Sequence, residues 1–118
     1  MTIAQTTIDK LIVALDVPTG NEALALARSL AGQVGMFKVG LELFCAEGPA
    51  FVREVQKAAP VFLDLKLHDI PNTVRKAMEA LLPLDPSLVT IHTQGDTPLL
   101  TAMRASETAG STGFIAAH

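Results

Sequence analysis

The chain has 118 residues, the length of one small domain. Its composition, 49% hydrophobic and 18% charged, is that of a globular protein and excludes a disordered chain. Nine Lys and Arg against twelve Asp and Glu give a net charge of −3, which argues against a nucleic-acid-binding protein.

Short apolar runs alternate with amphipathic stretches along the whole chain. The apolar runs predict strands of a parallel sheet covered on both faces, at residues 11–16, 36–40, 61–66, 88–92 and 113–117. Apolar residues at helical spacing predict helices between them, with faces in residues 23–30, 51–58 and 74–81 and a last helix over 98–109. This βαβ alternation predicts parallel strands joined by right-handed helical crossovers.

Two architectures accept this pattern, a doubly wound open sheet and a (β/α)8 barrel. A doubly wound nucleotide-binding domain is disfavoured because neither G-x-G-x-x-G nor a P-loop follows the first predicted strand, where residues 17–20 read Val-Pro-Thr-Gly. We treat residues 1–118 as a single domain, with residues 1–10 as an N-terminal extension.

Polar residues stand at the carboxyl ends of the first four predicted strands, where parallel α/β folds carry their chemistry. They are Asp16, Lys38, Asp64, Lys66 and His92. Asp64 and Lys66 are two residues apart, so both leave the same face of the strand, while Leu63 and Leu65 face the helices. Asp69 follows just beyond the strand.

Such a cluster of charges is costly to assemble, because each buried charge costs several kcal/mol unless it is paired. A structural ion-pair network is the alternative reading. Because four charged residues, Lys38, Asp64, Lys66 and Asp69, converge on neighbouring strand ends, a functional site is favoured. The pattern predicts acid–base or electrostatic catalysis on an anionic substrate.

The stretch from Val61 to Thr73 contains the pattern D-x-K-x-x-D-I-P-x-T, which resembles the signature of the orotidine 5′-phosphate decarboxylase family. Three further segments, ending at Asp16, Gly40 and His92, occur in the family's order, and the resemblance runs from about Leu11 to Ala105. It implies a (β/α)8 barrel, of which this chain covers the first four βα units and the start of a fifth strand. Such barrels typically have about 250 residues, so the resemblance also implies a fragment that lacks the family's phosphate-binding residues.

The resemblance implies decarboxylation of orotidine 5′-monophosphate to UMP and CO2, without a metal or organic cofactor, by a cytoplasmic homodimer. The implied catalytic residues are Lys38, Asp64, Lys66 and Asp69, with Lys66 as the proton donor. The implied substrate-binding residues are Asp16, Lys38, Asp64, Lys66, Asp69, Ile70 and Thr73. Among them, Asp16, Lys38 and Thr73 would contact the ribose, Ile70 would line the pocket of the leaving carboxylate, and Asp69 and Thr73 would reach the partner subunit's site.

Two other functions stay open. A sister family of magnesium-dependent sugar-phosphate decarboxylases and aldolases shares the D-x-K-x-x-D core, but the intact Ile70-Pro71-Asn72-Thr73 favours the nucleotide enzyme. A non-catalytic half-barrel that requires a partner chain is the other alternative.

The remaining polar residues have structural interpretations. Cys45 is the only cysteine, which excludes an internal disulfide, and we expect it to be buried. We expect His92 to line the site without a catalytic role, His68 to be solvated, and Glu42 and Glu47 to lie on the surface of a loop. No run reaches the roughly 18 apolar residues of a membrane span, and polar residues 1–10 do not resemble a secretory signal.

Overall fold

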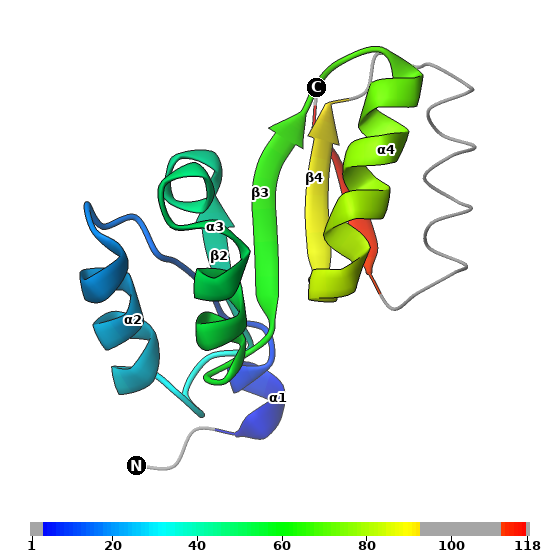
Figure 1. Ribbon diagram of the computed structural model, residues 1–118. Helices are drawn as coiled ribbons and strands as arrows, with labels where there is room; N and C mark the ends of the chain where they lie inside the picture. The colour runs from blue at the N-terminus through cyan, green and yellow to red at the C-terminus, as the bar shows by residue number, and fades with distance from the viewer. Residues whose placement is uncertain (1–3, 93–111, 118) are drawn as a thin grey trace. The chain divides into compact units, whose positions relative to one another are not determined.

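The computed structural model describes residues 4–92 and 112–117, and Figure 1 shows its strands and helices. The chain divides into two compact units, Met1–Phe62 and Leu63–His118, which we describe separately. The predicted helix over 98–109 lies outside the described residues. Strands and helices alternate as expected for the α/β class, with strand order β1-β2-β3-β4-β5.

The first unit contains two complete parallel strands and their covering helices. Its elements are α1 (Gln5–Ile8), β1 (Ile12–Ala14), α2 (Gly20–Ser29), β2 (Met36–Gly40) and α3 (Leu41–Gln56). Ile12 pairs with Met36 and Ala14 with Lys38. The Phe37 N–H donates to the Pro60 carbonyl over 2.9 Å, immediately before β3 (Val61–Leu67) begins.

The core of this unit lies between the strands and the two long helices. Its fully buried side chains include Ala23, Ala27, Phe37, Val39, Val52, Val55 and Val61. α2 begins at a regular N-cap, because the Thr19 hydroxyl accepts a hydrogen bond of 3.2 Å from the Glu22 N–H.

α3 consists of two helical segments separated at Gly48, whose backbone angles (φ 77°, ψ −173°) are not helical. Pro49 follows directly and opens the second segment, a position where its missing N–H is not needed. The first segment ends at Glu47, whose carboxylate accepts a hydrogen bond of 3.1 Å from the Gly20 N–H at the start of α2. The side chain of Glu47 therefore ties the first segment of α3 to α2.

The second unit continues β3 and adds α4 (Pro71–Leu81), the 3-10 helix η1 (Leu82–Leu84), β4 (Leu88–His92) and β5 (Gly113–Ala117). β4 and β5 are parallel, with Leu88 opposite Gly113 and His92 opposite Ala117. The predicted fifth strand is therefore confirmed.

α4 packs on the sheet of this unit through an apolar stripe. Pro71 is the first helical residue, and Val74 and Met78 are buried one turn apart. Together with Ile91 of β4 they form a core cluster against which Leu67 packs. The predicted helical face of residues 74–81 is confirmed.

Three local predictions are wrong. β1 ends at Ala14, earlier than predicted, although the Leu15 N–H still donates to the Lys38 carbonyl over 3.0 Å. Glu42 and Glu47 lie in α3 and not in a loop, because a positive φ at Gly48 lets two helical segments follow one another. Cys45 is exposed, because it lies two residues, or about 200° around the helix, from the buried Leu43.

No helix among residues 4–92 and 112–117 is long and apolar enough to cross a membrane.

Candidate functional site

Asp64 and Lys66, the pair predicted from their spacing on one strand, are in contact in the second unit. The Lys66 Nζ donates to Asp64 Oδ1 over 2.9 Å. The Asp64 side chain is 12% exposed, whereas that of Lys66 is 59% exposed. The pair thus presents a mostly buried carboxylate and an ammonium group that reaches solvent.

The flanking residues of β3 show why the charges share a face. Leu63 and Leu65 are buried, as the alternation of a strand covered by helices requires. Asp64 and Lys66 alternate with them and leave the opposite face.

A third residue, Thr90 of β4, completes this cluster. Its hydroxyl donates to Asp64 Oδ1 over 2.7 Å and accepts a hydrogen bond of 3.0 Å from the Lys66 N–H. Thr90 is 5% exposed, so both hydrogen bonds are largely shielded from water. Thr90 is not among the residues predicted from the sequence, although its alternation with the buried Val89 and Ile91 indicates the same sheet face as His92.

Lys66 adopts a left-handed backbone conformation within β3, with φ at 48°. A non-glycine residue in this region costs on the order of 1–3 kcal/mol and is found preferentially at functional sites. The N–H of this residue donates to the Thr90 hydroxyl over 3.0 Å.

Two histidines stack beyond the charged pair. The rings of His68 and His92 have centroids 4.4 Å apart and an interplanar angle of 21°. Within the part of the chain that the structure describes, the buried Nδ1 of His92 has no hydrogen-bond partner. His68 is exposed, as expected for a solvated side chain, but its stacking on His92 was not predicted.

The other predicted residues of this unit lie at the start of α4. Asp69, Ile70 and Thr73 are all exposed, and Ile70 is an exposed large apolar residue at 66%. The Asp69 carboxylate accepts a hydrogen bond of 2.7 Å from the Ile70 N–H. In the residues described, none of the three contacts the Asp64–Lys66 pair through a hydrogen bond or ion pair.

Asp16 and Lys38 belong to the first unit, where they lie near the carboxyl ends of β1 and β2. Lys38 pairs with Ala14 across the two strands, and Asp16 follows two residues later in the chain. Asp16 is exposed and Lys38 is half-buried.

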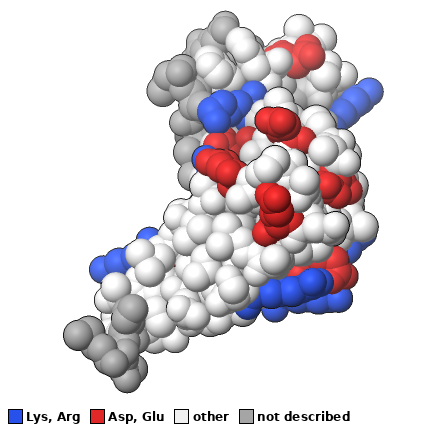
Figure 2. Space-filling model, turned by 90° about the vertical axis from the view of Figure 1, so that its left-hand side faces the viewer, with Lys and Arg blue, Asp and Glu red and all other residues white. Residues whose placement is uncertain are grey.

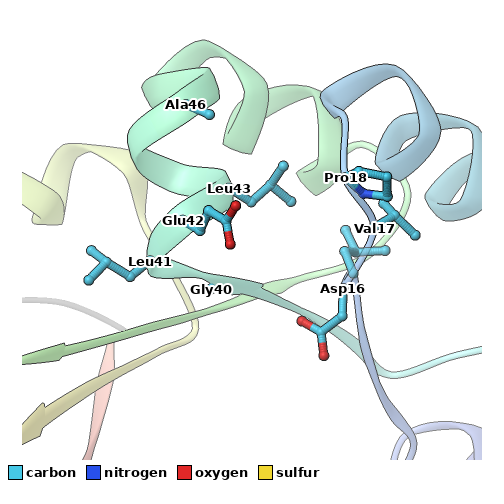
Figure 3. A pocket seen from close by; sticks show the side chains of 9 residues that line it. Asp16, Val17, Pro18, Gly40, Leu41, Glu42, Leu43 and Ala46 are labelled. Carbon is cyan, nitrogen blue, oxygen red and sulfur yellow. The ribbon is translucent and has the colours of Figure 1, made fainter.

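Asp16 lines a cavity of about 430 Å³ between the carboxyl end of β1 and the first segment of α3. In Figure 3, Glu42 and Leu43 project from α3 toward the segment that carries Asp16, Val17 and Pro18. Glu42 therefore belongs to the wall of this cavity, which our sequence analysis did not predict.

Several charged side chains elsewhere on the surface form ion pairs: Glu54 with Arg28 and Lys57, and Arg75 with Glu79. In the face shown in Figure 2, a group of basic side chains at the lower edge lies beside acidic ones, whereas several other acidic side chains are surrounded by uncharged surface. Glu54 is an example of a paired carboxylate: its hydrogen bond of 2.9 Å from Lys57, and then the charge of that lysine, hold the pKa of its carboxyl below the ordinary 4.5. Among the described residues, no group of three His, Cys, Asp or Glu side chains is arranged to hold a metal ion.

Known proteins resemble the chain in sequence. An "Orotidine 5'-phosphate decarboxylase" of Wolbachia sp. subsp. Brugia malayi (strain TRS) is 52% identical over 94 residues, which are 79% of this chain and 42% of that protein. A protein of the same name from Sphingopyxis alaskensis is 49% identical over 94 residues, with the same coverage. The chain thus spans about two fifths of the length of these relatives.

Solved structures resemble it in fold. A crystal structure of orotidine 5'-monophosphate decarboxylase from Methanocaldococcus jannaschii matches with a TM-score of 0.82 and 26% identity, over 91% of this chain and 53% of that one. A second structure with the same protein name and source, complexed with inhibitor BMP, gives a TM-score of 0.81 over 91% of this chain and 50% of that one. A crystal structure of an uncharacterized conserved protein from Geobacillus kaustophilus is 41% identical, with a TM-score of 0.79 over 89% of this chain and 52% of that one. The predicted fold class is confirmed, and this chain covers about half the length of these solved structures.

The family model described as "Orotidine 5'-phosphate decarboxylase / HUMPS family" matches residues 9–116, nearly the whole chain, and includes every predicted site residue from Asp16 to Thr73. The chain belongs to this family.

Proposed function

We propose that the chain is part of an orotidine 5′-phosphate decarboxylase, which converts orotidine 5′-monophosphate to UMP and CO2 in pyrimidine biosynthesis. The observation that carries the proposal is the Asp64–Lys66 contact of 2.9 Å within the family motif. The names of the relatives support the same reaction.

The chemistry of the pair suits a decarboxylation. When the bond from the pyrimidine C6 to the carboxylate breaks, CO2 leaves and the electron pair stays on C6. The Lys66 ammonium stabilises this developing negative charge and then transfers a proton to C6, so that UMP forms and the lysine becomes neutral until solvent reprotonates it.

Asp64 contributes through its negative charge. A substrate carboxylate placed beside it is repelled, and loss of CO2 relieves that repulsion. Binding energy from the phosphate at the far end of the substrate offsets the repulsion in the bound state.

The other residues are assigned from the family resemblance. Asp16, Lys38 and Thr73 bind the ribose, and Ile70 lines the pocket around the leaving carboxylate. Asp69 and Thr73 act in the partner subunit's site of a cytoplasmic homodimer. The exposure of Asp69, Ile70 and Thr73 supports this assignment, because side chains that reach into another subunit must be accessible.

The sister sugar-phosphate enzymes are the less favoured alternative. The relatives that we compared carry the name of the nucleotide enzyme, and the chain keeps Ile70-Pro71-Asn72-Thr73 after the shared core.

The decisive experiment follows the ultraviolet absorbance of orotidine 5′-monophosphate in the presence of the chain, alone and with the C-terminal half of a family relative added. We expect Lys66→Ala to lower turnover by about 10²- to 10⁴-fold, the usual contribution of a general acid. Lys76→Ala, which removes an exposed lysine of α4, serves as the matched control and should retain turnover. Absence of turnover in both arms, or equal turnover in the two variants, would contradict the proposal.

A further inference from the structure

The Thr90 side chain is hydrogen-bonded both to the Asp64 side chain and to the Lys66 backbone. Its hydroxyl uses both of its functions at once: the proton is donated to Asp64 Oδ1 and a lone pair accepts the Lys66 N–H. Because Thr90 is 5% exposed and its hydroxyl is bonded on both sides, this hydroxyl has a single favourable orientation.

Asp64 Oδ1 thus receives two hydrogen bonds, from Thr90 over 2.7 Å and from the Lys66 Nζ over 2.9 Å. The first comes from a buried strand residue, and the second from a long side chain that is 59% exposed. Because a lysine side chain is flexible and this one is largely solvated, the lysine cannot by itself hold the carboxylate in one position. The buried Thr90 hydroxyl, which is held by its strand, can keep the carboxylate in position.

The backbone of Lys66 needs a similar constraint. Its φ of 48° is unfavourable for a residue with a β-carbon, and such conformations persist only when their surroundings fix them. The hydrogen bond from the Lys66 N–H to Thr90 is a contact that fixes this conformation.

We propose that Thr90 is a positioning residue, whose hydroxyl holds the Asp64 carboxylate and the strained Lys66 backbone in the arrangement that the decarboxylation requires. The inference rests on the proposed function for its catalytic consequence, but not for its geometry. Thr90 does not itself transfer a proton to the substrate.

The test compares Thr90→Val, which keeps the shape and removes the hydroxyl, with Thr90→Ser, which keeps the hydroxyl. Amide hydrogen exchange, followed by NMR, reads the geometry without any need for activity. We expect exchange at the Lys66 N–H to become about tenfold faster in Thr90→Val and to change little in Thr90→Ser. The Phe37 N–H, bonded to the Pro60 carbonyl in the first unit, is the internal control and should exchange equally in all three proteins.

The second readout is turnover of orotidine 5′-monophosphate in the preparation that supports it. We expect Thr90→Val to lower kcat by about tenfold with little change in KM, and Thr90→Ser to restore most of kcat. Unchanged exchange at Lys66 in Thr90→Val would overturn the inference, and so would a raised KM at unchanged kcat. If no wild-type preparation turns over, the proposed function fails, and the exchange measurement still decides whether Thr90 sets this geometry.

Discussion

The contact between Glu47 and Gly20 predicts that the effect of Gly20→Ala on stability depends on whether Glu47 is present. The Glu47 carboxylate accepts the Gly20 N–H over 3.1 Å. A β-carbon on residue 20 would lie 2.4 Å from the Glu47 Cδ, closer than any tolerated contact. Gly20→Ala therefore expels the Glu47 side chain, which is flexible and can move into solvent.

The magnitude follows from two opposing effects. Loss of a hydrogen bond to a charged acceptor costs about 1.5 kcal/mol at the low end of the usual range, which suits an exposed glutamate. Alanine in place of glycine in a helix stabilises by about 0.5 kcal/mol. Gly20→Ala should thus destabilise the wild-type chain by about 1 kcal/mol, whereas in Glu47→Ala, where no hydrogen bond remains to be lost, it should stabilise by about 0.5 kcal/mol.

Urea unfolding followed by circular dichroism measures the four free energies of this double-mutant cycle. Glu42→Ala provides the matched background, because Glu42 is an exposed glutamate of the same helical segment that does not contact Gly20. There, Gly20→Ala should destabilise as it does in the wild type. An equal effect of Gly20→Ala in the Glu47→Ala and Glu42→Ala backgrounds would refute the reasoning.

Two further predictions concern the core of α4 and a surface ion pair. Met78 is 1% exposed, so Met78→Ala should lower the free energy of unfolding by about 2–3 kcal/mol, while Lys76→Ala on the exposed face should change it by less than about 0.5 kcal/mol in urea unfolding; similar effects of the two would contradict the described packing. The lowered pKa of Glu54 means that its contribution to stability is present above its unfolded pKa and is lost as the pH falls through its folded pKa. Lys57→Ala should raise the Glu54 pKa toward the ordinary 4.5, as an NMR titration of its carboxyl carbon would show, and identical titration in both proteins would exclude Lys57 as the cause.

The alternation of strands and helices could be predicted because it is a local property of the sequence. Continuous apolar runs indicated four strands that the structure places at or within a few residues of the predicted bounds, from Met36–Gly40 to Gly113–Ala117. The contact of Asp64 with Lys66 followed from their spacing of two on one strand.

What the sequence did not reveal depends on backbone angles or on contacts between distant residues. The left-handed φ of Lys66 cannot be predicted from its residue type, because lysine rarely adopts this conformation. The role of Thr90 depends on two hydrogen bonds to residues more than twenty positions away in the sequence. Cys45 was expected to be buried from its residue type alone, but the face of a helix that turns inward is decided by its neighbours.

The break in α3 requires, at Gly48, a backbone handedness opposite to that of the helical residues on either side. The angles of Gly48, φ 77° and ψ −173°, are the mirror image of the extended conformation that ordinary L-residues prefer. A β-carbon built there meets nothing within 4 Å, so the space around it would admit a side chain and only chirality forbids it. Glycine, being achiral, is the one encoded residue that supplies this mirror-image step without strain. Gly48, which is achiral, thereby joins the segment of α3 that lines the cavity to the segment that packs in the core.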